Sequence, residues 1–160
     1  MVKLTFYEKP GCINNRRQRH LLEAQGCTLE GRNLLSEIWN RQLLAHFFTH
    51  HREITQWFNK NSPRIKSGEI KPHLLSADDA LGVMVDDPLL IRRPLIACYR
   101  GNKIFRSSGF DYAHLNSSLN LNLNIPSDSN AFVGEDIETC PRSNKSTSAT
   151  NSMVAYYASA

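Results

Sequence analysis

The chain has 160 residues, of which 41% are hydrophobic and 21% are charged, a composition typical of one soluble globular domain. No apolar run is long enough to span a membrane, and residues 1–3 lead into an expected strand rather than a signal peptide. Residues 1–115 carry 17 basic and 11 acidic side chains, whereas residues 116–160 carry 2 and 4. This mild basicity suits an anionic small molecule or an acidic partner, and it argues against nucleic acid as a partner.

The four cysteines lie far apart, at Cys12, Cys27, Cys98 and Cys140. Their spacing matches neither a metal-binding finger nor a dense disulfide framework. The cysteines therefore predict a reducing compartment, the cytoplasm. Cys27 and Cys98 fall in expected strands, where a cysteine is usually a buried core residue.

The first third of the chain predicts a β-α-β unit. A strand is expected over residues 3–7, followed by a helix from Ile13 to Gln25 that Gly26 ends. Residues 27–34 are expected to form a second strand.

The middle of the chain predicts helices. A helix capped by Ser36 is expected to run to Phe48, because apolar residues recur there at helical spacing. A short apolar turn is expected at 54–59 and a loop at 62–68. Ser76 and Asp79 resemble a capping box, which predicts a helix that ends before Pro88.

The last third predicts two strands, 95–99 and 103–106, joined by a turn at 100–102, and then a short helix at 110–119. From residue 120 onward, Asn, Ser and Thr predominate, which predicts a largely disordered tail. The expected organisation is an α/β domain with a central mixed β-sheet over residues 1–119 and a tail over 120–160.

Cys12 is the candidate nucleophile. It lies between a strand and a helix, where unpaired backbone N–H groups and the helix dipole lower a thiol pKa. A purely structural cysteine would explain the residue equally well. Asn15 occupies the position of the second cysteine in a Cys-x-x-Cys motif, so turnover would require an external thiol or a distant cysteine. Cys140 in the tail is one such distant cysteine.

Several arginines could bind an anion near Cys12. Arg16 and Arg17 lie in the first helical turn, where a cation opposes the helix dipole, although they also fit a solvated surface. Arg93 precedes Pro94, a candidate for a cis peptide bond at a site rim. Arg93 and Arg106 could cradle an oxyanion, or they could form ordinary surface ion pairs with Asp86 and Asp87.

Three histidines, His46, His50 and His51, lie on or beside the second expected helix. The first two have the i, i+4 spacing of a metal-binding pair, but no carboxylate or cysteine completes a ligand set. No metal site is therefore expected.

The motifs around Cys12 and Pro94 are similar to those of a known family. The run from Tyr7 to Cys12, followed by Asn14, Asn15 and Arg16, together with residues 90–95, resembles the arsenate-reductase-like branch of the thioredoxin superfamily. Its nitrogenase-associated protein subgroup is more similar still, over residues 6–15, 57–59, 63–68, 87–95, 109–111 and 136–141.

The resemblance implies a thioredoxin-like fold with an inserted helical region and Cys12 as the only active-site thiol. It implies an anion- or substrate-binding set that comprises Arg93, Arg106, Arg16, Asn14, Asn15 and Pro94. No bound cofactor is implied; glutathione is the external reductant, with glutaredoxin as a partner. Asn59 and Glu8 stand where arsenate reductases have an arginine and a histidine. Because a carboxylate near a thiol raises the thiol pKa and repels oxyanions, arsenate is not the expected substrate.

Two functions are therefore compared. The first is a monothiol oxidoreductase of the arsenate-reductase-like type, linked to nitrogen fixation, that uses Cys12. The second is a non-enzymatic nitrogenase-associated accessory or regulatory protein that binds a protein partner. Delivery of a metal or cluster lacks ligands in the sequence.

Overall fold

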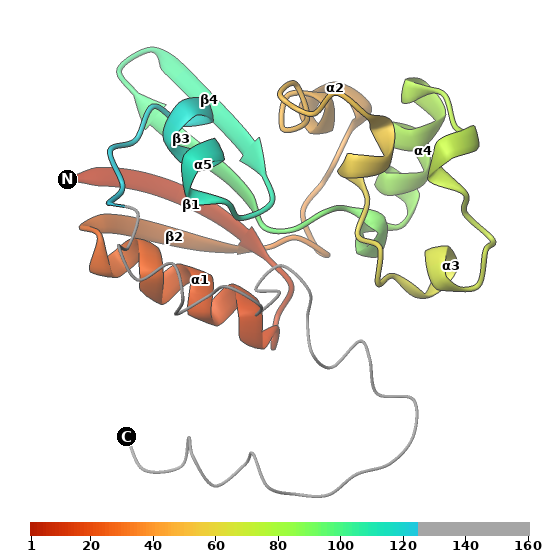
Figure 1. The fold of residues 1–160 in the computed structure, drawn as a ribbon, viewed down its shortest axis with the longest axis horizontal. Helices are drawn as coiled ribbons and strands as arrows, with labels where there is room; N and C mark the ends of the chain where they lie inside the picture. The colour runs from red at the N-terminus through yellow and green to blue at the C-terminus, as the bar shows by residue number, and fades with distance from the viewer. Residues whose placement is uncertain (125–160) are drawn as a thin grey trace, which may run out of the picture.

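The computed structural model describes residues 1–124, which form a four-stranded sheet with helices around it (Figure 1). The strands are β1 (Val2–Glu8), β2 (Cys27–Asn33), β3 (Leu95–Arg100) and β4 (Lys103–Ser108), in the order β2-β1-β3-β4. β1 and β2 are parallel, whereas β3 is antiparallel to both β1 and β4. The predicted α/β fold with a central mixed sheet is confirmed.

One face of the sheet packs against α1 (Ile13–Ala24) and α5 (Tyr112–Ser118). Alternate strand residues point to the same face, and here they bury Leu4, Phe6, Ile96 and Cys98. Figure 1 shows α1 along β2 and α5 against the β3–β4 hairpin. Gly26 follows α1 with φ of 83°, the left-handed conformation for which glycine is favoured.

The opposite face carries the inserted region, residues 34–94, which contains short helices. They are α2 (Arg41–Ala45), η1 (Ile54–Trp57), α3 (Pro63–Lys66), η2 (Pro72–Leu74), α4 (Ala77–Asp86) and η3 (Pro88–Leu90). Tyr7, Leu95 and Ala97 of the sheet pack here against Trp39 and Phe47. The predicted helical insertion between β2 and β3 is confirmed.

The helix predicted from Ser36 to Phe48 was wrong in extent. α2 covers only Arg41–Ala45, and Asn40 caps it by accepting a hydrogen bond from the Leu43 backbone N–H. Upstream, the Trp39 indole donates to the Leu34 carbonyl oxygen at 2.8 Å, which holds the preceding segment in a loop. Ile38, one of the apolar residues whose spacing predicted that helix, is 91% exposed. The predicted loop at 62–68 contains α3, which Pro63 begins.

Two other local predictions, the helix cap at Ser76 and the burial of two cysteines, are confirmed. The Ser76 hydroxyl accepts a hydrogen bond from the Asp79 N–H at 3.1 Å and caps α4. Cys27 and Cys98 are both buried in the core beneath α1 and α5. Within residues 1–124, no helix has the length and apolar composition to cross a membrane.

The packed chain continues past residue 119, where the tail was expected to begin. Leu121 and Leu123 are buried against the same core as α5. The Gln25 side chain also exchanges two hydrogen bonds, each 3.0 Å, with the Asn124 backbone. Cys140 and the rest of the expected tail lie outside the described residues.

Candidate active site around Cys12

Cys12 is the N-cap residue of α1, in the turn that links β1 to the helix. Its backbone N–H donates to the Lys9 carbonyl oxygen at 3.1 Å, and its own carbonyl accepts from the Arg16 N–H at 3.2 Å. Gly11 makes the turn possible with φ of 75°. The Cys12 side chain is only 5% exposed and makes no capping hydrogen bond to α1. The thiol therefore lies at the positive end of a twelve-residue helix.

A pocket of about 390 Å³ opens beside the thiol, and it is lined by Glu8, Pro10, Gly11, Cys12, Arg16, Arg19, His20 and Glu23. Arg19 donates to the Glu8 carboxylate at 2.8 Å and lies 4.0 Å from Glu23. The Glu8–Arg19 pair was not predicted from the sequence, although Arg19 lies seven residues after Cys12, on the same helix face. The pair offsets the negative charge of Glu8 at the pocket.

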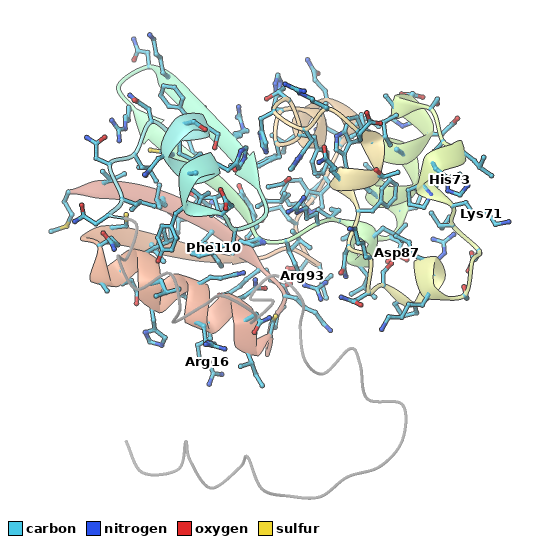
Figure 2. All side chains as sticks on the ribbon, viewed as in Figure 1. Arg16, Lys71, His73, Asp87, Arg93 and Phe110 are labelled. Atoms are coloured by element: carbon cyan, nitrogen blue, oxygen red, sulfur yellow. The ribbon has the colours of Figure 1, made fainter. Side chains whose placement is uncertain are left out.

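Arg93 and Pro94 lie at the same end of the sheet as Cys12. The Arg93–Pro94 peptide bond is cis, as the sequence suggested. β3 pairs Leu95 with Tyr7, so one further step along the ladder brings Pro94 opposite Glu8, where β1 ends. Figure 2 shows Arg93 beside the segment in which β1 leads into α1.

Arg93 is buried, and two of its three guanidinium nitrogens lack a hydrogen-bond partner among residues 1–124. Its side chain is 4% exposed, and its Nε and Nη1 atoms have no hydrogen-bond partner in the described part of the chain. Asp87, one of the carboxylates considered as its partner, pairs with Arg64 at 3.5 Å instead. Because a buried cation without partners is costly, an anion that accepts from these two nitrogens would fit this position.

The other predicted site residues take different positions. Arg16 is exposed and lines the Cys12 pocket, whereas neither Arg93 nor Arg106 does. Arg106 is half-buried on β4, and its guanidinium carbon lies 5.8 Å from the centre of the Phe47 ring. The structure thus brings Cys12 and Arg16 around one pocket and places Arg106 on the face covered by the inserted region.

The buried amides near Cys12 point into the protein. Asn14 and Asn15 are both buried in the first turn of α1. The Asn15 amide contacts the Lys9 backbone and the Gln18 side chain. Asn59 links its loop to η3: its Nδ2 donates to the Leu89 carbonyl oxygen at 3.2 Å, and its Oδ1 accepts from the Asn61 N–H at 3.2 Å.

A second pocket, the histidine pocket, has a volume of about 470 Å³ and is lined by His50, His51, Arg52, Glu53, Gln56, Arg92, Ser108, Phe110, Asp111 and His114. The ring centre of His50 lies 4.3 Å from that of His51 and 3.8 Å from that of His114. His51 Nε2 and Ser108 Oγ share a hydrogen bond of 2.6 Å. His114, which completes the cluster, was not singled out in the sequence because it lies more than sixty residues away, on α5.

Burial lowers the pKa of two of the imidazoles in the histidine pocket, those of His50 and His51. The pKa of His50 falls to about 3, through burial and then through His114 and His51. The pKa of His51 falls to about 4, through burial and then through Arg92. Among residues 1–124, no group of three or more His, Cys, Asp or Glu side chains could hold a metal ion.

Comparison with known proteins identifies a close relative. No protein-family model matches the chain. The uncharacterized 15.7 kDa protein in the draG 3' region of Rhodospirillum rubrum is 39% identical over 141 residues, which cover 88% of this chain and 90% of the relative. The chain belongs to the family of that protein. Regulatory protein MgsR of Bacillus subtilis is a more distant relative of this chain. The two are 26% identical over 59% of this chain and 75% of the length of MgsR.

Several solved structures similar to this chain are described as arsenate reductases or as proteins related to them. One, described as a possible arsenate reductase from Streptococcus mutans, is 25% identical and covers 72% of this chain and 99% of its own, with a TM-score of 0.57. Arsenate reductase from Vibrio cholerae has a TM-score of 0.58 at 21% identity, over 76% of this chain and 98% of its own. The thioredoxin-like fold of the arsenate-reductase type, expected from the motifs, is confirmed.

Proposed function

We propose that the protein is a monothiol oxidoreductase in which Cys12 is the nucleophile and glutathione is the external reductant. The observation that carries the proposal is the position of Cys12 as N-cap of α1, beside a pocket and without a capping role for its thiol. Thiols at helix N-termini are stabilised as thiolates, and the thiolate is the attacking species. Cys27 and Cys98, the other described cysteines, are free and buried in the core.

The reaction proposed is the reduction of a mixed disulfide between a substrate thiol and glutathione. The Cys12 thiolate attacks the glutathione sulfur, and the substrate leaves as a thiolate that takes a proton from water. A second glutathione thiolate attacks the Cys12–glutathione disulfide, which releases glutathione disulfide and restores Cys12. The electrons that reduce the substrate sulfur come from the incoming glutathione thiol, which ends in glutathione disulfide, so one protein cysteine is sufficient.

Arg93 supports an anionic substrate in this proposal. Among residues 1–124, its Nε and Nη1 have no hydrogen-bond partner, and they would donate to a carboxylate or an oxyanion at the sheet end where Cys12 lies. Glu8, which would repel such an anion, is held by Arg19. The chemistry therefore favours a substrate with at least one negative group near its reacting sulfur.

A link to nitrogen fixation, with glutaredoxin or a nitrogenase-related protein as a partner, is a further part of the proposal. It is supported by the motif resemblance and by the name of the Rhodospirillum rubrum relative, which places that protein in the draG 3' region.

The alternative is a non-enzymatic accessory or regulatory protein that binds a protein partner. The similarity to Regulatory protein MgsR of Bacillus subtilis favours this alternative, since that protein is named for regulation. The fold itself is compatible with both functions.

The deciding experiment follows alkylation of Cys12 by iodoacetamide against pH, with the Cys12 peptide quantified by mass spectrometry. A midpoint well below about 8.5, the value of a free cysteine, is expected. Glutathione-dependent reduction of a glutathionylated peptide should accompany it. An ordinary midpoint without turnover would reject the oxidoreductase and leave partner binding as the function.

A further inference from the structure

The first turns of α1 bury three side-chain amides instead of apolar groups. Asn14 is 2% exposed, and Asn15 and Gln18 are both 0% exposed. Amides removed from water are stable only when their hydrogen bonds are made inside the protein. The hydrogen-bond partners of these amides therefore show which part of the backbone the amides hold in place.

Asn15 holds the turn that precedes Cys12. Its Oδ1 accepts a hydrogen bond from the Lys9 backbone N–H at 3.1 Å. The carbonyl of the same residue, Lys9, accepts from the Cys12 N–H at 3.1 Å. Both polar backbone groups of Lys9 are thus engaged, one by the helix side chain and the other by the cysteine backbone.

Gln18 fixes the orientation of the Asn15 amide. A backbone N–H can only donate, so the Asn15 atom that faces Lys9 must be the oxygen. The Asn15 Nδ2 then points along the helix, where it donates to Gln18 Oε1 at 2.8 Å. Without that acceptor, the buried Asn15 NH₂ group would lose its partner, and the amide would no longer be held toward Lys9.

We propose that Asn15 and Gln18 are positioning residues for the Cys12 thiol, acting through the Lys9–Cys12 turn. They keep the cysteine at the N-terminus of α1, where the helix stabilises a thiolate. This inference rests on the proposed thiol function. It gives Asn15 a specific role: at the position where a dithiol protein has its second cysteine, this chain has the amide that holds the first one in place.

The test uses Gln18→Met and Asn15→Leu, which keep side-chain size and remove the hydrogen bonds. Gln25→Met is the matched control, because Gln25 is an amide at the other end of α1 that exchanges two hydrogen bonds with Asn124. Two readouts are needed in the full-length protein: the amide hydrogen-exchange rates of Lys9 and Cys12 by NMR, and the pH midpoint of Cys12 alkylation by iodoacetamide.

In both test variants, exchange at Lys9 and Cys12 should accelerate at least about tenfold, because the tether no longer opposes opening of the turn. The alkylation midpoint should rise by about one pH unit, toward the value of a free cysteine. The Gln25→Met control should lose thermal stability while both Cys12 readouts stay at the wild-type values. Asn15→Leu is the harsher change, so Gln18→Met decides the outcome if Asn15→Leu does not fold.

Unchanged exchange at both amides in Gln18→Met would overturn the positioning role. Faster exchange with an unmoved midpoint would also overturn it, because the turn would be held without controlling the thiol. An ordinary wild-type midpoint would instead reject the proposed thiol function, and the exchange rates would then show by themselves whether the amides hold the turn.

Discussion

The Cys12 pocket and the histidine pocket differ in how their ionisable side chains are stabilised. Around Cys12, charged groups are matched inside the protein, as with Glu8 and Arg19. In the histidine pocket, three imidazoles lie close together, and burial favours the neutral form of His50 and His51. Removing a charged partner in the first pocket should therefore change the reactivity of Cys12. Protonation of the histidines in the second pocket should instead lower the free energy of unfolding. Four measurements test this difference.

The largest effect is expected from Cys12→Ser. A hydroxyl is a far weaker nucleophile than a thiolate, so glutathione-dependent reduction of a mixed disulfide should fall to the background rate. Circular dichroism and thermal unfolding should remain close to wild type, since Ser is a good N-cap residue. Undiminished turnover in Cys12→Ser would place the chemistry at another residue.

Arg93→Met should weaken the binding of an anionic substrate without lowering the thermal stability of the protein. Loss of charge-assisted hydrogen bonds to an anion predicts a KM about 10- to 100-fold higher for a carboxylate-bearing mixed disulfide. The melting temperature should be unchanged or raised, because the variant removes a buried cation whose Nε and Nη1 lack hydrogen-bond partners among residues 1–124.

Arg92→Met is the matched control for Arg93→Met, since Arg92 is the preceding cation and lines the histidine pocket. It should leave that KM unchanged. Equal losses in both variants would mean that general positive charge, and not the Arg93 site, attracts the substrate.

Acid should destabilise the protein through the histidine pocket. His50 and His51 have folded pKa values of about 3 and about 4, below the ordinary 6.5, so the unfolded chain binds more protons in between. The free energy of unfolding should be at its full value above pH 6.5 and should fall as the pH drops toward 4. Between pH 6.5 and pH 5 we expect a loss on the order of 2 kcal/mol, after allowance for partial solvent screening.

Urea unfolding followed by circular dichroism at both pH values measures this loss. His50→Gln should reduce the pH dependence, whereas His20→Gln should not, because His20 is exposed on α1 outside that pocket. An equally steep pH dependence in His50→Gln would assign the acid sensitivity to other groups.

The smallest effect is expected from Arg19→Met. Without its 2.8 Å partner, the Glu8 carboxylate should act more strongly on the neighbouring thiol. The alkylation midpoint of Cys12 should rise by about half a unit. Glu8→Gln should shift it in the opposite direction, and a midpoint unmoved in both variants would show that Glu8 does not influence the thiol.

Elements fixed by local chemistry could be predicted from the sequence. The Ser76 cap, the stop at Gly26 and the strand on either side of the 100–102 turn depend on near neighbours. The helix expected from Ser36 failed because two contacts override its apolar spacing: the Asn40 cap and the bond from the Trp39 indole to Leu34. Periodicity alone does not contain such contacts.

The sequence indicated candidate residues of the site, but it did not indicate which side chains contact one another. The position of a cysteine after a strand made Cys12 a candidate nucleophile, and the position of a proline before a strand made Pro94 a candidate cis residue. The Glu8–Arg19 pair and the contact between His50 and His114 join residues that are distant in sequence. Only the folded chain determines which of several possible partners each group meets.

The two tryptophans of the chain, Trp39 and Trp57, both belong to the inserted region. Trp57 stacks on Phe48 within that region at 5.1 Å, while Trp39 contacts Tyr7 of β1 at 5.1 Å between ring centres. Intrinsic tryptophan fluorescence therefore reports on the inserted region and on its contact with the sheet. If tryptophan emission changes at a lower denaturant concentration than far-ultraviolet circular dichroism, the inserted region separates before the sheet unfolds.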